Sequence, residues 1–149
     1  MLEMVLLATD GSQYSDKAAS FAARLLGNTP CKLILLTVFE EPVYPMPHDE
    51  ITPPLEAIPP YEDIHEAFLD DAEALLNDAQ APLLKAGVEV ETKVRFGHPA
   101  AEILGELEEG GYEMIIMGSH GHGVFGEVQL GSVSYRISHH AKCPVLIVR

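Results

Sequence analysis

The stretch Met4–Ser12 reads MVLLATDGS and joins an apolar run to a turn signal. Met4–Thr9 is short and almost entirely apolar, which is typical of a strand that is buried on both faces of a sheet. The DGS that follows consists of residue types that form turns. The stretch therefore predicts a buried strand that ends in a turn, after which a new element begins.

The same alternation continues outward from this strand. Ser15–Leu26 carries its apolar residues at helical spacing and is closed by Gly27, and Lys32–Phe39 (KLILLTVF) is a second buried strand. The remaining predicted elements are a helix within Tyr61–Gly87, a strand at Val88–Arg95, a helix at Pro99–Glu109, a strand at Glu113–Met117, a helix at Ser132–His140 and a strand at Pro144–Val148.

Strands that alternate with helices predict an α/β fold, a doubly wound parallel sheet of five strands with helices on both faces. The length of 149 residues suits a single domain over residues 1–149, and no internal repeat interrupts it. Val88–Arg95 alternates polar and apolar residues, so this strand is expected to be half exposed. Ligands of such sheets bind beyond the carboxyl ends of the strands, where the strand order reverses.

Two segments are less regular. Glu40–Asp63 holds seven prolines and seven acidic residues, which predicts a long connection at the surface. Pro82 follows a helical pattern and is predicted to kink or end that helix near Ala79, because proline has no N–H to donate.

The composition excludes several classes of function. The formal net charge is −14, which argues against binding to nucleic acid or to an anionic membrane, since both need clustered Lys and Arg. No apolar run is long enough for a membrane span, and the N-terminus lacks a signal-peptide pattern, so we expect a cytoplasmic protein. Between Leu33 and Leu84 there are twelve acidic residues and no Lys or Arg. This acidic side is expected to be a solvated face or, alternatively, a docking surface for a basic partner.

The segment Gly118–Ser132 (GSHGHGVFGEVQLGS) holds five glycines and no Lys or Arg. Gly121–Gly126 matches the GxGxxG dinucleotide fingerprint, but that fingerprint belongs at the start of a βαβ unit and needs an acidic residue about twenty positions on. No acidic residue follows Glu127, and the chain has no Gly-Lys pair for a P-loop. Both of these phosphate-binding motifs are therefore excluded.

A different spacing fits the segment better. Gly118 and Gly121 are separated by two residues, and nine residues then lead to Gly131 and Ser132 at a predicted helix start. The first N–H groups of a helix have no partner within it, and the helix dipole favours an anion there. The spacing predicts a backbone that lies close to phosphates.

With these residues in view, the chain resembles the universal stress protein family, and in particular its ATP-binding subgroup. The resemblance covers nearly the whole chain and rests on ATDGSQYS (8–15), GSHG…LGSVS (118–134) and CPVLIV (143–148). It implies a sheet of order 3-2-1-4-5, a homodimer through the C-terminal strand, and one ATP or AMP per chain, with Mg²⁺. The family often has Lys or Arg in the nine-residue spacer, and this chain has none.

The resemblance also implies roles for individual residues. By position, Ala8, Thr9 and Asp10 would lie beside the ribose and adenine, Val38 would offer main-chain groups to the adenine edge, Met117 would pack near the base, and Gly118, His120, Gly121, Gly131, Ser132, Val133 and Ser134 would hold the ribose and phosphates. No residue is identified as catalytic, and no metal ligands are identified.

The sequence therefore predicts a small regulatory protein of the stress response in which ATP is mainly a bound ligand, with slow hydrolysis or none, and in which a regulatory protein of unknown identity is the partner. The alternative is a homodimeric interaction module that holds no nucleotide and acts through its acidic face. An adenylating enzyme or a flavoprotein would need an SGG-type phosphate loop after the first strand, and TDGSQYS lacks it.

Overall fold

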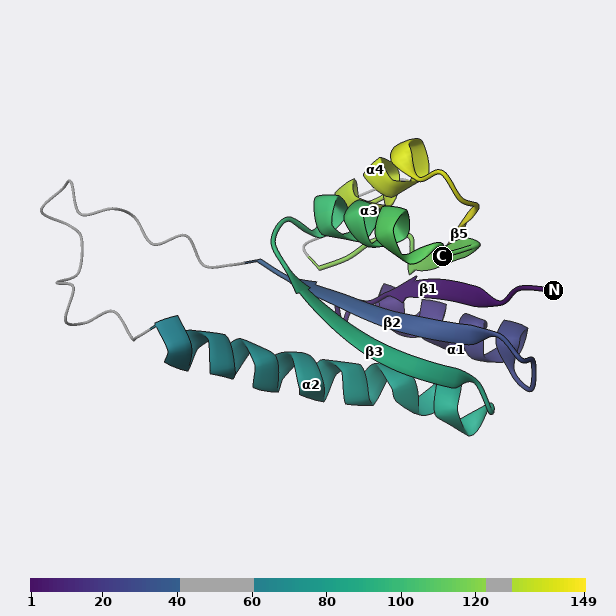
Figure 1. The fold of residues 1–149 in the computed structure, drawn as a ribbon, viewed down its shortest axis with the longest axis horizontal. Helices are drawn as coiled ribbons and strands as arrows, with labels where there is room; N and C mark the ends of the chain where they lie inside the picture. The colour runs from purple at the N-terminus through teal and green to yellow at the C-terminus, as the bar shows by residue number, and fades with distance from the viewer. Residues whose placement is uncertain (41–60, 123–129) are drawn as a thin grey trace, which may run out of the picture.

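The structure, a computed structural model, describes residues 1–40, 61–122 and 130–149 (Figure 1). Its elements in chain order are β1 (Met4–Ala8), α1 (Gln13–Leu26), β2 (Lys32–Phe39), α2 (Tyr61–Lys85), β3 (Glu89–Phe96), α3 (Pro99–Gly110), β4 (Met114–Gly118), α4 (Ser132–His140) and β5 (Val145–Val148). Each predicted element is present, with ends that differ by at most two residues apart from α2. Most of the predicted surface connection Glu40–Asp63, and Gly123 and Gly126 of the glycine segment, lie outside the described residues.

The five strands form one parallel sheet in the order β3-β2-β1-β4-β5, as the resemblance implied. β1 is central: Leu6 pairs in register with Ile34 of β2 and with Ile115 of β4. The chain moves outward through β2 and β3 on one side of β1, and through β4 and β5 on the other. The strand order therefore reverses between β1 and β4, at the place where such sheets bind ligands.

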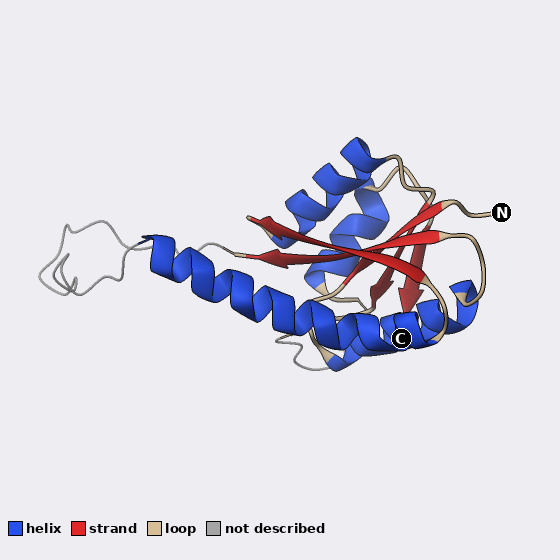
Figure 2. Cartoon of the chain, turned by 60° about the horizontal axis from the view of Figure 1, so that its bottom comes forward, coloured by secondary structure: helices blue, strands red, loops and turns tan. Residues whose placement is uncertain are grey.

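Helices cover both faces of the sheet (Figure 2). Alternate residues of the central strands point to opposite faces, and each set packs against a different pair of helices. One core lies under α1 and α2 and includes Val5, Leu7, Leu33, Leu35, Ala22, Leu76 and Leu83. The other lies under α3 and α4 and includes Leu6, Ile34, Leu36, Ile115, Met117, Ile103 and Ile137. The doubly wound arrangement is thus confirmed.

Pro82 lies inside α2, which runs from Tyr61 to Lys85 without a break. The helix was predicted to kink or end near Ala79, and it does not end there. Proline cannot donate to the preceding turn, but helical bonding resumes beyond it, because the Ala86 N–H donates to the Pro82 carbonyl over 3.2 Å. Ala79 and Leu83 are both buried in the core, so packing on either side of Pro82 holds one helix together.

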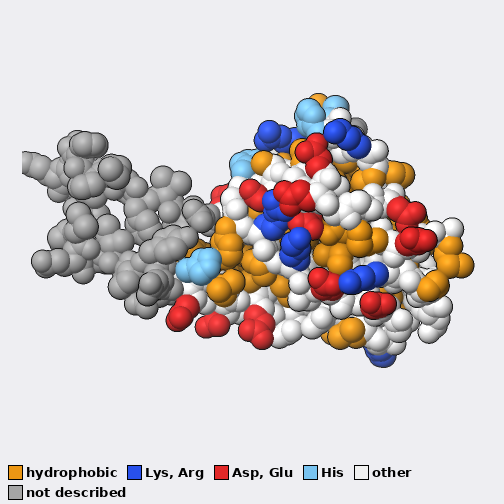
Figure 3. All heavy atoms as spheres, in the orientation of Figure 1, with side chains coloured by type: hydrophobic (Ala, Val, Ile, Leu, Met, Phe, Trp, Pro, Cys, Tyr) orange, Lys and Arg blue, Asp and Glu red, His pale blue; other side chains and the backbone are white. Residues whose placement is uncertain are grey.

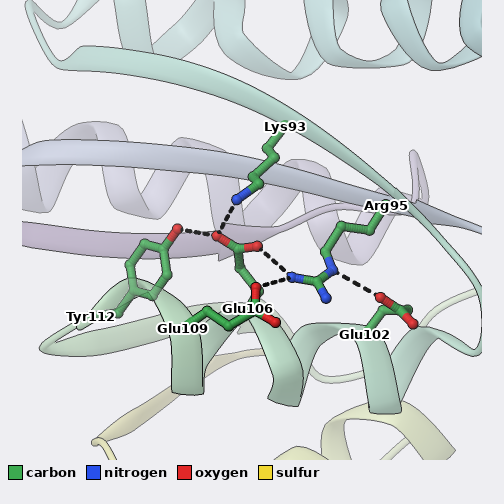
Figure 4. Close-up of polar contacts among 6 residues, drawn as sticks. All are labelled: Lys93, Arg95, Glu102, Glu106, Glu109 and Tyr112. Carbon is green, nitrogen blue, oxygen red and sulfur yellow. Dashed lines mark hydrogen bonds and ion pairs between the residues drawn. The ribbon is translucent and has the colours of Figure 1, made fainter.

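A network of charged side chains ties the edge strand β3 to α3 (Figure 4). Its centre is Glu106, whose side chain is 2% exposed. Glu106 accepts from the Tyr112 hydroxyl over 2.6 Å, from Lys93 Nζ over 2.9 Å and from Arg95 Nη1 over 2.8 Å. Both oxygens of the buried carboxylate thereby accept hydrogen bonds, two of them from cations, which is the condition under which a buried charge is tolerated. The network fixes α3 over the sheet.

We expect the network to make folding sensitive to acid. Burial alone would raise the pKa of Glu106, but the hydrogen bonds from Tyr112, Arg95 and Lys93 outweigh it and hold that pKa below its ordinary value. A lowered folded-state pKa contributes stability that is fully present above the unfolded pKa of about 4.3 and is lost as pH falls through the folded value.

Thermal unfolding followed by circular dichroism between pH 7 and pH 3 should therefore show less loss of stability on acidification in Glu106→Gln than in the parent. Equal losses in both proteins would mean that Glu106 does not contribute to the acid sensitivity.

Among the described residues, no helix combines the length and the apolar character that crossing a membrane requires.

Candidate functional site

A cavity of about 730 Å³ opens at the carboxyl ends of β1, β2 and β4. It lies at the point where the strand order reverses, and residues from β1, β2 and β4 and from the starts of α3 and α4 line it. All twelve residues to which the resemblance gave a role line this one cavity: Ala8, Thr9, Asp10, Val38, Met117, Gly118, His120, Gly121, Gly131, Ser132, Val133 and Ser134. Segments that are more than 100 positions apart in the chain are thus brought to one place.

Asp10 joins the turn after β1 to the loop after β4. Its Oδ1 accepts the Ser12 N–H over 2.9 Å, and its Oδ2 accepts the His122 N–H over 3.0 Å. The His122 ring makes a second contact with Asp10. Its Nε2 lies 2.8 Å from the Asp10 carbonyl oxygen and must donate to it, because a carbonyl oxygen can only accept. Partial burial opposes ionisation of Asp10, but the hydrogen bonds from Ser12 and His122 outweigh it and lower the pKa of Asp10. Asp10 is therefore a fixed anion on the cavity wall at neutral pH.

The start of α4 is bound to the end of β4. The Ser119 carbonyl accepts from the Gly131 N–H over 2.8 Å and from the Ser134 hydroxyl over 2.7 Å. Gly131 is the N-cap of α4, and its carbonyl accepts the first helical bond, from the Tyr135 N–H over 2.9 Å. The N–H groups of residues 132–134 have no partner within the helix, and no side chain caps them. Because these residues line the cavity, its floor offers backbone donors and the positive end of a helix dipole.

Part of the cavity lining is apolar. Leu36 and Val38 of β2, Met117 of β4 and Ile103 of α3 all line the cavity. Leu36, Ile103 and Met117 are buried in the core beneath α3 and α4, and Val38 packs partly against that core. The lining of the cavity therefore combines apolar side chains with hydrogen-bonding groups, the usual combination in small-molecule sites.

His120 lies between two of the elements that form the site. Its Nδ1 is 2.9 Å from the Ser119 hydroxyl oxygen, and its ring centroid is 5.0 Å from that of Tyr14 on α1. Thr9 and Ser15 extend the polar wall, where the Thr9 hydroxyl donates to Ser15 Oγ over 3.1 Å. These contacts fix the loop after β4 against the first turn of α1.

Seven further residues line the cavity: Ser15, Leu36, Glu40, Pro99, Ile103, His122 and Leu130. Of these, His122 was expected from the sequence only as an alternative to His120 beside the phosphates. Pro99 and Ile103 come from α3, whose start was predicted correctly but whose position over the sheet was not. Glu40 directly follows the strand β2, in one of the turns that the sequence places at the ligand-binding edge of the sheet. Within the described parts of the chain, no group of three His, Cys, Asp or Glu residues could hold a metal ion.

Solved structures share this fold over nearly the whole chain. That of MJ0577 from Methanocaldococcus jannaschii is 26% identical, with a TM-score of 0.80, and the match covers 99% of this chain and 96% of that chain. Three universal stress proteins have been solved with a bound nucleotide: one with cAMP, one from Archaeoglobus fulgidus with dAMP, and one from Arabidopsis thaliana with AMP. Their identities of 22%, 19% and 20%, with TM-scores of 0.72, 0.64 and 0.68, show the shared fold alone. Those matches cover 99%, 100% and 98% of this chain and 97%, 98% and 90% of those chains.

The sequence also matches universal stress proteins directly. The universal stress protein YxiE of Bacillus subtilis is 34% identical over 157 aligned positions, and the match covers 100% of both chains. The pattern of the universal stress protein family matches residues 1–149, the full length of the sequence. The chain therefore belongs to the universal stress protein family.

Proposed function

We propose that the cavity binds one adenine nucleotide per chain and that the protein is a small regulatory protein of the stress response. The observation that carries the proposal is the start of α4, where residues 132–134, whose N–H groups have no partner within the helix, line a cavity that is partly apolar. Backbone donors at a helix start favour a phosphate, and an apolar lining favours a flat base. The relatives solved with cAMP, dAMP and AMP support an adenine nucleotide as the ligand.

The nucleotide acts mainly as a bound ligand in this proposal, and ATP, if bound, is hydrolysed slowly or not at all. Hydrolysis needs a group that orients and deprotonates the attacking water. Asp10 is a weak base, since its pKa is lowered and both of its carboxylate oxygens already accept backbone N–H groups. Binding would instead alter the surface around the cavity, where a partner can make contact.

Native mass spectrometry of the purified protein tests the proposal at low cost. An added mass equal to AMP, ADP or ATP is expected on each chain, and adding free nucleotide should fill any empty fraction. A flavin mass, or a protein that stays free of nucleotide after this addition, would contradict the proposal.

We also propose a homodimer through β5. This strand lies at the edge of the sheet, and all four of its residues are half-buried. The carbonyls of Pro144 and Val148 accept from Ile115 and Ser119, so alternate residues bond to β4. The backbone groups of Val145 and Ile147 then point to the free edge, which a second copy can cover.

A proline at Ile147 tests this interface. It removes an N–H that points away from β4, so Ile147→Pro should convert a dimer into a monomer or cause aggregation, as measured by size-exclusion chromatography with light scattering. The matched control is Ile147→Val, which retains the N–H and should stay dimeric. A parent protein with the mass of one chain would refute the dimer.

A second candidate function is an interaction module that works through the acidic face without a nucleotide. Exposed acidic residues lie along α2, among them Glu66, Asp70, Asp71 and Glu73, and Figure 3 shows acidic side chains along the N-terminal half of this helix. The bound mass found by native mass spectrometry separates the two candidates, because only the first needs a nucleotide.

A further inference from the structure

The basic side chains in the cavity lining are two histidines. None of the nine Lys and Arg residues of the chain lines the cavity, although all nine lie within the described residues. His120 and His122 do line it. Histidine is the side chain that gains or loses its charge between pH 5 and pH 8, so a positive side chain in this lining depends on the pH.

His120 lies beside the start of α4. A Cβ on Gly131, the N-cap of this helix, would lie 3.1 Å from the His120 Cα. The Gly131 N–H also donates over 2.8 Å to the carbonyl oxygen of Ser119, the residue before His120. The backbone of His120 therefore packs against the helix start whose N–H groups the proposed function assigns to the phosphate.

The contacts of the His120 ring suit both its neutral and its protonated form. Its Nδ1 lies 2.9 Å from Ser119 Oγ, and a hydroxyl group can donate to a neutral ring nitrogen or accept from a protonated one. The centroid of the ring lies 5.0 Å from that of the Tyr14 ring, a distance at which an aromatic ring can attract a cation. The ring can therefore take up a proton without losing either contact.

The neighbouring elements bring other charged groups to this place. Burial opposes the ionisation of Asp10 after β1, but its hydrogen bonds outweigh burial and lower its pKa, so it stays an anion. Glu40 after β2 is the second carboxylate of the lining, and α4 contributes no charged residue to it. On α1, Lys17 Nζ lies 5.8 Å from the centroid of the Tyr14 ring. The second histidine, His122, donates to Asp10 through its backbone N–H and through Nε2.

We infer that His120 makes nucleotide binding depend on pH, with tighter binding when its ring is protonated. The inference rests on the proposed function and adds a form of regulation to the same site. A phosphate at the start of α4 is an anion, and a positive charge on the residue packed against this helix start attracts it. The bound phosphate favours the protonated ring in return, so binding takes up protons near neutral pH. A fall in pH thereby raises the fraction of the protein that holds a nucleotide.

Calorimetric titration with AMP at pH 6 and at pH 8 tests the inference on the parent protein and on His120→Gln. The phosphate of AMP itself gains a proton near pH 6, but this contribution is common to both proteins and cancels when they are compared. The ratio of the affinity at pH 6 to the affinity at pH 8 should be about fivefold higher in the parent protein. Proton uptake on binding at pH 7, measured in buffers with different heats of ionisation, should also be larger in the parent protein.

Two further variants separate the charge of His120 from its shape and position. His122→Gln makes the same change at the other histidine of the lining and should retain the pH response of the parent protein, whatever its affinity at pH 8. His120→Lys places a permanent positive charge at this position. It should bind AMP at pH 8 about fivefold more tightly than His120→Gln does, and its pH response should equal that of His120→Gln.

Equal pH responses in the parent protein and in His120→Gln would overturn the inference and leave the proposed function standing. Loss of the response in His122→Gln but not in His120→Gln would also overturn it, because the response would then belong to the other histidine. If the parent protein binds neither AMP, ADP nor ATP at either pH, both the inference and the proposed function are wrong.

Discussion

Replacing Glu106 with glutamine should lower the free energy of unfolding by about 2–4 kcal/mol, a large share of the stability of a protein of this size. Glutamine retains the shape but has one acceptor oxygen in place of two. Its amide N–H₂ would face either Arg95 or the pair formed by Tyr112 and Lys93, all of which are donors. At least one donor loses its acceptor, and the cost is largest for the Tyr112 hydroxyl, whose bond to Glu106 is buried.

The matched control is Glu109→Gln on the same helix. Glu109 also accepts from Arg95, over 3.1 Å, but its side chain is 67% exposed. An ion pair in that environment contributes little, so Glu109→Gln should cost less than about 0.5 kcal/mol. Chemical denaturation followed by circular dichroism gives both values.

A double-mutant cycle with Tyr112→Phe isolates the central contact. Removing the hydroxyl as well as the carboxylate eliminates the unpaired donor, so part of the loss in Glu106→Gln should be recovered in the double variant. Equal stabilities of Glu106→Gln and Glu109→Gln would show that the network around Glu106 does not hold α3 to the sheet.

Replacing Gly131 with valine should lower the affinity for adenine nucleotides at least about tenfold. The backbone of Gly131 is extended, with φ of −68° and ψ of 165°, so valine can adopt it without strain. The cost comes from space instead. A Cβ would lie 3.1 Å from His120 Cα and 3.4 Å from the Ser119 carbonyl oxygen, and the branches of valine extend further. The start of α4 must move away from β4, and its N–H groups then lose their position in the cavity.

Gly111→Ala provides the control for this change. Gly111 ends α3 with a φ of 66°, and no atom lies within 4 Å of where its Cβ would be. Alanine there should cost about 1 kcal/mol of stability through backbone strain and leave nucleotide affinity unchanged. Gel filtration and circular dichroism should confirm that both variants fold. Nucleotide affinity in Gly131→Val equal to that of the parent would show that the start of α4 does not hold the phosphate.

The order of helices and strands could be predicted because the spacing of apolar residues differs clearly between the two kinds of element. The central strands are almost entirely apolar, and the helices begin and end at residues such as Ser12, Pro99 and Gly111. A parallel sheet with helices on both faces buries these strands together with the apolar faces of the helices. Pro82 is an exception with a physical reason. Proline disfavours the interior of a helix, but the burial of Ala79 and Leu83 on either side of it outweighs that cost.

The candidate site was predictable only in part. The loops after β1 and β4 were identified, since turn residues and glycines directly follow apolar runs there. The contribution of α3 was not, because no local pattern says where Pro99 and Ile103 will lie over the sheet. The glycine spacing predicted a backbone close to phosphates, and this stays a prediction. In the structure, the nearest atoms to a side chain at Gly131 belong to the backbone of residues 119–121, so this glycine brings α4 and β4 together.

The central claim is that the cavity at the carboxyl ends of β1, β2 and β4 binds an adenine nucleotide through the start of α4. Calorimetric titration of the parent protein and of Gly131→Val with AMP tests it most directly. We predict saturable binding of one AMP per chain in the parent and an affinity at least about tenfold lower in the variant. A parent protein that gives no saturable heat with AMP, ADP or ATP would contradict the claim.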